Sequence, residues 1–216
     1  MSKRTTKQRT RAPDVTRQKL LSAAFEEIYR SGFQAASLDR ILAKAGVTKG
    51  ALYHHFLDKA ELGYAVVDEV VKGLLLQRWL GLLDQQAGDP LTALQGVLRQ
   101  RAASLTADEI EFGCPLNNLA QEMSPLDERF RRLVDATFET WRKGFARALE
   151  RGQAEGSVRQ DVDARKVAAF LVAAAEGSYG LAKSANSRTM LRSNLETLAT
   201  YLDSLRAAPR EGRQAR

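Results

Sequence analysis

Two histidines stand side by side in this chain, His54 and His55, and the chain has no others. Imidazole side chains bind metal ions and transfer protons near neutral pH. Adjacent residues of a helix point about 100° apart, so this pair is poorly arranged to share one metal ion, for which a spacing of three or four residues is needed. The single cysteine is far away in sequence, and few carboxylates lie nearby. We therefore expect no metal site, no acid–base catalysis and no cofactor at this pair.

The residues around the histidines are predicted to form two short helices joined by a tight turn. Ser37 can cap the first helix, and Gly46 ends it in the left-handed conformation that costs glycine little. Thr48 can cap the second helix, KGALYHHF. This arrangement is typical of a helix-turn-helix, whose second helix enters the major groove of DNA with its N-terminal residues leading. Lys49 could reach guanine or phosphate, and Gly50 lets the backbone come close.

The excess of positive charge lies in the same part of the chain. The net charge is +7; residues 1–60 hold 12 Lys and Arg against 5 Asp and Glu, whereas residues 61–216 hold 21 of each. A short basic module before a longer neutral one indicates a polyanion-binding head on a body with another task. The charge alone is equally compatible with a basic tail that only keeps the protein soluble.

Apolar residues that recur every three or four positions predict helices along the whole chain. A helix that begins at Asp58 should bury Leu62, Val66, Val70 and Leu74 on one side. The other predicted helices cover about residues 14–31, 90–106, 115–123, 125–152, 163–184 and 188–206. We find no persuasive alternating strand pattern and no internal repeat. The predicted fold class is therefore all-α, with about nine helices.

Composition and the pattern of apolar residues indicate the cellular compartment in which we expect the protein. No apolar run approaches the ~18 residues of a membrane span. The basic start, MSKRTTKQRTRAPD, has no apolar segment after it and is not a secretory signal. A single cysteine, Cys114, excludes an intramolecular disulfide framework. We expect a soluble protein in a reducing cytoplasm, without membrane contact.

The stretch SLDRILAKAGVTKGALYHHF, followed by LDKAEL, resembles the N-terminal domain of TetR-family transcriptional regulators. The resemblance covers about residues 14–62, with Leu42 in place of the alanine usual in the family. It implies that Tyr53 and His55 contact DNA phosphates and that His54 contacts backbone or base, although Tyr53 could also only pack the domain. The expected DNA-binding residues are Ser37, Thr48, Lys49, Gly50, Tyr53, His54, His55 and Lys59.

One such head contacts too few base pairs for specificity against a genome, so we expect a homodimer on a palindromic operator in double-stranded DNA. The resemblance implies that the last two helices form a four-helix bundle across the dimer axis. The alternative is that both faces serve the chain's own core. The expected interface residues are Phe170, Ala174, Gly177, Leu181, Leu191, Leu195, Leu198 and Leu202.

The resemblance also implies a cavity for a small-molecule effector among the middle helices, although each aromatic residue there could equally be plain core. Asn117 and Asn118 would supply hydrogen-bonding groups between apolar side chains, as ligand sites require. The effector itself is not indicated. The expected lining is Phe112, Cys114, Asn117, Asn118, Met123, Phe138, Trp141 and Tyr179.

Cys114 precedes Pro115 and could lie at a helix N-terminus, where a thiolate is stabilised. It could sense oxidants or electrophiles, or simply fill space in the core. It has no plausible base as a catalytic nucleophile, so we do not expect an enzyme.

The predicted function is a ligand-responsive, homodimeric repressor; the alternatives are a sensor acting through Cys114 and a non-specific DNA-binding protein. The predicted domains are a disordered basic arm at 1–13, a helix-turn-helix domain at 14–57, a helical effector-binding and dimerisation domain at 58–207 and a flexible tail at 208–216.

Overall fold

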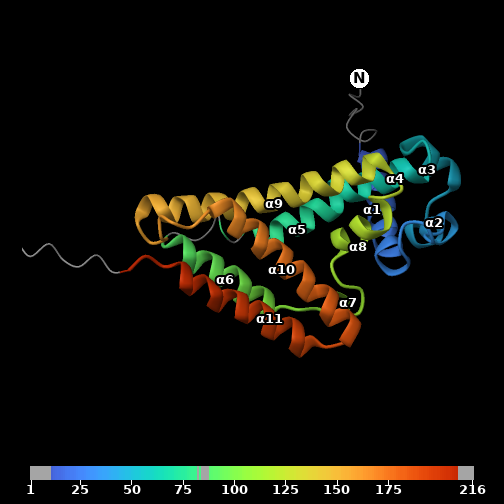
Figure 1. The fold of residues 1–216 in the computed structure, drawn as a ribbon. Coiled ribbons are helices and arrows are strands. Elements are labelled where there is room, and N and C mark those ends of the chain that lie inside the picture. The colour runs from blue at the N-terminus through green and yellow to red at the C-terminus, as the bar shows by residue number, and fades with distance from the viewer. Residues whose placement is uncertain (1–10, 82, 84–87, 209–216) are drawn as a thin grey trace, which may run out of the picture. The chain divides into compact units, whose positions relative to one another are not determined.

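The computed structural model describes residues 11–81, 83 and 88–208, and it is built from helices (Figure 1). This confirms the predicted all-α fold class. Within those residues the β structure is limited to an isolated bridge between Val158 and Arg206. None of the described helices is long and apolar enough to cross a membrane. Residues 1–10 of the predicted basic arm and residues 209–216 of the predicted tail lie outside the described part.

The chain packs as two compact units. The first contains the residues up to Leu74 together with Pro115–Thr137, and the second contains Leu75–Cys114 and the residues from Phe138 onward. The predicted functional boundary between residues 57 and 58 does not follow this packing division and stays a prediction. Helices of the first unit are α1 (Arg11–Ser31), α2 (Leu38–Ala45), α3 (Lys49–His55), α4 (Lys59–Ala65), a π-helical segment (Val66–Val71) and α8 (Pro115–Met123). Those of the second unit are α6 (Pro90–Ala103), α7 (Ala107–Glu111), α10 (Ala164–Ala185), α11 (Arg188–Tyr201) and a 3-10 turn (Leu202–Leu205), while α5 (Lys72–Trp79) and α9 (Glu128–Glu155) contribute to both units.

In the first unit, α2 and α3 are packed against α1 and joined by the turn at Gly46 (Figure 1). Gly46 has φ +64°, its N–H bonds to Ala43 O at 3.3 Å, and the N–H of Val47 bonds to Leu42 O at 3.3 Å. These two bonds satisfy the last carbonyls of α2 in the Schellman pattern and reverse the chain. The turn predicted from the glycine is confirmed.

The start of α1 differs from the expected one. Helix α1 begins at Arg11, so the last residues of the predicted arm, including Pro13, are helical. The first backbone N–H groups of a helix have no acceptor within the helix. Proline, which lacks this N–H group, is therefore compatible with the first turn.

The helix that begins after Asp58 changes its buried face halfway along. Val70 and Leu74 were expected to face the core, but Val71 and Leu75 are buried instead. The reason is the π-helical segment Val66–Val71, which holds one more residue per hydrogen-bonded turn and so shifts the following side chains by one position. A regular helical period cannot anticipate such a shift.

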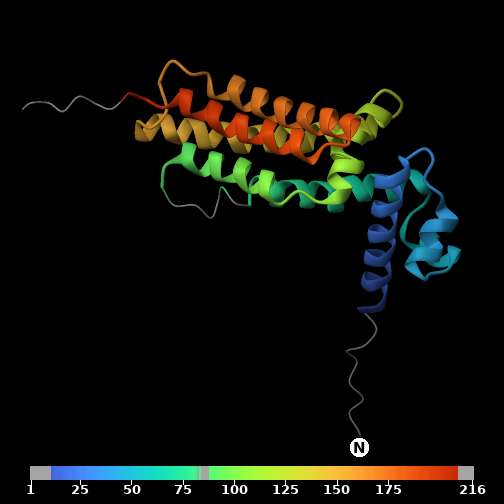
Figure 2. The same cartoon turned by 90° about the horizontal axis from the view of Figure 1, so that it is seen from below.

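In the second unit, α11 packs alongside α6 and α10 (Figure 2). The leucines of α11 that were expected in a dimer interface lie in this packing layer, with at most 8% of their surface exposed. The burial of these leucines favours the alternative that this face serves the chain's own core, and their place in a dimer interface stays a prediction. The buried leucines are Leu191, Leu195, Leu198 and Leu202.

Helix α7 was not predicted. A capping box begins it: the Thr106 hydroxyl accepts from Glu109 N at 3.2 Å, and the Glu109 carboxylate accepts from Thr106 N at 2.9 Å. Such a short helix has too few turns to show an apolar period, but the Thr-x-x-Glu spacing was visible in the sequence.

Candidate functional site

Helix α3 presents its first turn to solvent and anchors itself through a single buried leucine. Thr48 caps the helix by accepting from Ala51 N at 3.2 Å. Leu52 is fully buried. Lys49 and Gly50 are exposed, and Tyr53 has 47% of its surface exposed. The side chains expected to lead into the major groove are therefore on one accessible turn.

The charge of Lys49 is not neutralised by any residue that the structure describes. The cations of the neighbouring helix α2 are: Arg40 Nε donates to Glu27 Oε1 at 2.8 Å, and Lys44 pairs with Glu26. The Arg40 guanidinium lowers the pKa of Glu27, so that this carboxylate stays ionised. Lys49 makes no ion pair or hydrogen bond with a described residue, so its ammonium can bind an anion without breaking an internal contact.

The two histidines end α3. Their ring centroids are 5.1 Å apart in an edge-on arrangement, with His54 exposed and His55 half-buried next to Phe56. In the part of the chain that the structure describes, no group of three or more His, Cys, Asp and Glu side chains is arranged to hold a metal ion.

Besides Thr48, two more of the expected DNA-binding residues also have structural roles. Ser37 caps α2 through its hydroxyl, which accepts from Arg40 N at 3.4 Å. Lys59 is half-buried; its ammonium donates to Gln34 O at 3.0 Å and lies 5.0 Å from the centre of the Phe33 ring. A phosphate contact by Lys59 therefore remains a prediction, and it would use the donors that Gln34 leaves unoccupied.

The loop between α1 and α2 is held from the other side by a carboxylate of α8. Glu122 accepts from the backbone N–H groups of Phe33 and Gln34, each at 2.8 Å. Two such bonds to an ionised acceptor are stronger than neutral ones and fix the orientation of the loop. Within the first unit, the helix-turn-helix is thus tied directly to α8, a contact that the sequence did not indicate.

The residues expected to line an effector cavity are divided between the two units. Asn117, Asn118 and Met123 belong to α8 of the first unit, with Met123 buried and the asparagines half-buried. Trp141 and Tyr179 are buried in the second unit. The other residues of the expected lining in the second unit are Phe112, Cys114 and Phe138.

Around Tyr179 the second unit contains a group of buried polar side chains, which we call the buried polar cluster: Arg101, Glu109, Cys114, Glu176 and Tyr179. Arg101 pairs with Glu109 and donates to the Tyr179 hydroxyl at 3.1 Å. Burial raises the pKa of Tyr179, so its phenol stays protonated. Burial also raises the pKa of Glu176 to about 7, and a contact with the Cys114 thiol opposes that shift.

Of this cluster only Cys114 and Tyr179 were singled out from the sequence. Glu176 had a visible signal, because it is the one charged residue between Lys166 and Lys183 in an otherwise apolar stretch. Arg101 had none, since its contact with Tyr179 joins residues that are distant in sequence.

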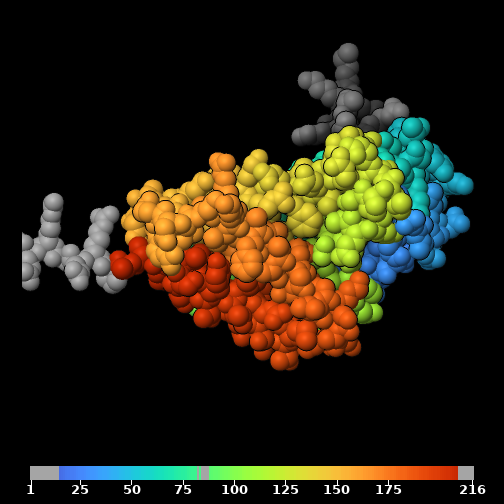
Figure 3. Space-filling model, in the orientation of Figure 1, coloured from blue at the N-terminus to red at the C-terminus, as the bar shows by residue number. Residues whose placement is uncertain are grey.

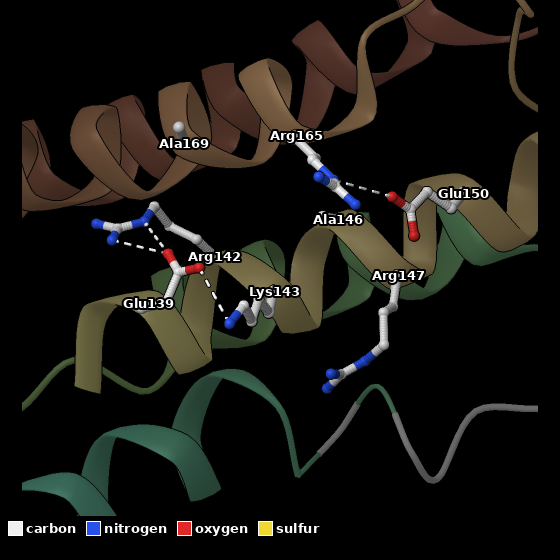
Figure 4. Close-up of a pocket in the computed structure, with 8 residues that line it drawn as sticks. All are labelled: Glu139, Arg142, Lys143, Ala146, Arg147, Glu150, Arg165 and Ala169. Atoms are coloured by element: carbon white, nitrogen blue, oxygen red, sulfur yellow. Dashed lines mark hydrogen bonds and ion pairs between the residues drawn. The ribbon is translucent and has the colours of Figure 1, made fainter. Parts of the chain in front are cut away.

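An open groove runs between α9 and α10 of the second unit, with a volume of about 400 Å³ (Figure 4). Its carboxylates are neutralised: Glu139 pairs with Arg142 and Lys143, and Glu150 with Arg165. Small-molecule sites are mostly apolar with a few polar groups. This charged and exposed groove therefore does not match the mostly apolar site that was expected for an effector.

One face of α10 carries apolar side chains that no helix of the second unit covers. Phe170 is 50% exposed and Leu181 is 60% exposed, with the exposed glycines Gly177 and Gly180 between them. Tyr201 of α11 continues this face, because its ring lies 5.4 Å from that of Phe170. Figure 3 shows the surfaces of α10 and α11 next to each other on one side of that unit.

A helix-turn-helix with an accessible, positively charged second helix defines a DNA-binding protein. Two family descriptions match the chain: "Bacterial regulatory proteins, tetR family" over residues 20–66, and "Tetracyclin repressor-like, C-terminal domain" over residues 90–198. The chain therefore belongs to the TetR family of bacterial transcriptional regulators.

Individual relatives agree with this assignment. An HTH-type transcriptional regulator of Lactococcus lactis subsp. lactis is 32% identical over 87% of this chain and 93% of its own length. The HTH-type transcriptional repressor DhaR of Mycobacterium sp. (strain GP1) is 30% identical over 75% of this chain and 79% of its own. A TetR transcriptional regulator from Chloroflexus aurantiacus J-10-FL has the same fold, with a TM-score of 0.80 and 28% identity over 92% of this chain and all of that one. These are transcriptional regulators, and the chain is a regulator rather than an enzyme.

Proposed function

We propose that this chain is a homodimeric repressor that binds a palindromic operator through α3 and is released from it by a small-molecule effector. The observation that carries the proposal is the first turn of α3, where Lys49 is exposed and has no partner among the described residues, while Leu52 anchors the helix. An exposed cation at the start of a recognition helix is placed to contact base edges or phosphates. The repressor DhaR, among the relatives, supports repression as the direction of control.

The exposed apolar face of α10 supports the dimer. Phe170 and Leu181 are large apolar side chains left in solvent, and Gly177 lies between them where a second helix can approach closely. Apolar patches of this kind mark interaction sites in proteins that otherwise bury such residues. A two-fold symmetric dimer carries two copies of α3, the number that the two half-sites of a palindrome require.

Cys114 gives little support to the alternative of a redox or electrophile sensor. Only 4% of its surface is exposed, and the carboxyl of Glu176 lies next to it. Reactive cysteines are accessible to solvent, which this one is not.

The experiment is fluorescence anisotropy of the purified protein with the promoter DNA that flanks its own gene and with a scrambled duplex, at several salt concentrations. Lys49→Ala and Tyr53→Ala should weaken binding to the promoter DNA, whereas Lys143→Ala, an exposed lysine of α9, should not. If Lys49 contacts a phosphate, its removal lowers the salt slope by about 0.9. Equal affinity for both duplexes in all four proteins would show a non-specific DNA-binding protein and reject the proposal.

A further inference from the structure

Glu176 is a buried carboxylate without an ion-pair partner among the described residues. It lies in the middle of α10 with 7% of its surface exposed, and neither of its oxygens has a hydrogen bond of normal geometry. No described residue forms an ion pair with it, and its polar neighbour is the Cys114 thiol, which is a weak donor. An ionised carboxylate in such a place is unfavourable unless another group supplies charge or hydrogen bonds.

The cation of the same cluster is committed elsewhere. Arg101 pairs with Glu109, and Arg78 also donates to Glu109, at 2.9 Å. Glu109 thus has two arginines, while Glu176 has none. Among the described residues of the second unit, the Glu109 carboxylate is therefore neutralised by arginine, whereas the Glu176 carboxylate is not.

Unpaired donors lie in the same group of side chains. Arg101 Nε and Trp141 Nε1 are buried without a hydrogen-bond partner. Arg101 connects to Tyr179, one turn after Glu176 on α10, and its guanidinium carbon lies 5.9 Å from the centre of the Trp79 ring. The Trp79 ring stacks on Trp141 with centroids 4.5 Å apart. Unpaired acceptors, unpaired donors and aromatic faces therefore belong to one contiguous part of the second unit.

We propose that Glu176 binds the effector of this regulator, and that this effector carries a protonated amine attached to an apolar or aromatic group. An ammonium group supplies the two features that Glu176 lacks nearby, a positive charge and N–H donors. It forms charge-assisted hydrogen bonds with a carboxylate. The aromatic side chains next to the cluster suit the apolar part and add attraction for a cation. The inference rests on the proposed function only in calling this ligand the effector; the site itself is independent of DNA binding.

The two tryptophans of the chain, Trp79 and Trp141, report on this region without a label. The full-length protein is titrated with three probes of similar shape, 2-phenylethylamine, 2-phenylethanol and phenylacetate, while tryptophan fluorescence is recorded at pH 8. The three differ chiefly in head-group charge, so a preference among them reads the charge of the site. We expect the amine to bind at least tenfold more tightly than the alcohol or the carboxylate.

Glu176→Gln keeps the shape of the side chain and removes its charge, and it should abolish the preference for the amine. Glu176→Asp keeps the charge on a shorter stem and should retain a weaker preference, which separates a binding role from a purely structural one. Glu150→Gln, an exposed glutamate of α9, is the control and should bind the probes as the unmodified protein does. Circular dichroism and melting temperature show that each variant is folded.

Equal binding of the three probes, no amine-dependent change up to the solubility limit, or an unchanged preference in Glu176→Gln each overturns the inference. Adding the amine to the protein–operator complex tests the proposed function separately. Binding of the amine without release of DNA keeps the site and rejects its role as an effector site. If the protein does not bind the operator but still prefers the amine, and this preference depends on Glu176, the repressor proposal is rejected and the site is kept.

Discussion

The hydroxyl of Tyr64 donates a hydrogen bond to Oδ2 of Asp127 at 2.6 Å, which joins α4 to the start of α9 within the first unit. This bond raises the pKa of Tyr64 to about 12 and lowers that of Asp127. The other oxygen of Asp127 caps α9, accepting from the N–H groups of Arg129 and Phe130 at 2.8 and 2.9 Å. One carboxylate therefore both begins a helix and fixes it to α4, the helix that follows α3.

Tyr64→Phe removes that hydrogen bond and leaves the ring in place. A hydrogen bond to a charged acceptor contributes about 1.5–3 kcal/mol, so the free energy of unfolding should fall by about that amount in urea denaturation. Asp127→Ala should cost more, since it also removes a helix cap. Tyr53→Phe, which alters an exposed hydroxyl without a hydrogen bond to any described residue, is the control; in the absence of DNA it should change stability little. A double variant as unstable as the sum of both single ones would contradict the direct coupling of Tyr64 and Asp127.

Gly63 is required by the packing of α4. A Cβ at this position would lie 2.4 Å from Phe33 Cε2 and 2.8 Å from Phe130 Cζ, two rings that already pack with centroids 4.7 Å apart. Gly63→Ala should therefore destabilise the protein by about 1–3 kcal/mol, the usual cost of overpacking. Gly73→Ala on α5 meets no atom within 4 Å and should instead stabilise it by up to about 1 kcal/mol, because alanine favours the helix. Opposite shifts of the melting temperature in the two variants are the expected result; a loss in Gly73→Ala equal to that in Gly63→Ala would refute the steric explanation.

The helix-turn-helix could be predicted from sequence because its determinants are local. Gly46, Thr48 and Leu52 act through bonds and contacts within a few residues, and each was placed correctly. The cover of Leu195 and its neighbours in α11 could not be predicted, since a helical period shows that a face is apolar but not which helix covers it. Glu176 was missed for a related reason: a buried carboxylate is recognised by what it lacks around it, and those surroundings come from segments distant in sequence.

Leu181 provides a test of the dimer face on α10. It is 60% exposed, and placing an aspartate there would bury an unpaired charge in any interface formed by this face. Leu181→Asp should therefore shift the protein toward monomer in sedimentation velocity, with little change in circular dichroism. Leu126→Asp, at a leucine of similar exposure in the first unit, serves as the control and should keep the oligomeric state. The reverse pattern would move the interface away from α10.

Glu176 should make the stability of the protein depend on pH. Burial raises its pKa from 4.5 to about 7 in the folded chain, so the unfolded state loses the proton at lower pH than the folded state does. The neutral form therefore contributes its full stability below about pH 4.5, and that contribution is lost as the pH rises to about 7. The glutamine of Glu176→Gln cannot ionise, so this variant should not lose that stability. The free energy of unfolding of Glu176→Gln, relative to that of the unmodified protein, should therefore rise across this pH range by up to about 3 kcal/mol.

Urea denaturation at pH 5, 6, 7 and 8, with Glu150→Gln in parallel, measures the difference. A gap between Glu176→Gln and the unmodified protein that is the same at pH 5 and pH 8 would show that Glu176 is paired or solvated in the folded state, and would remove the reason for a ligand at this carboxylate.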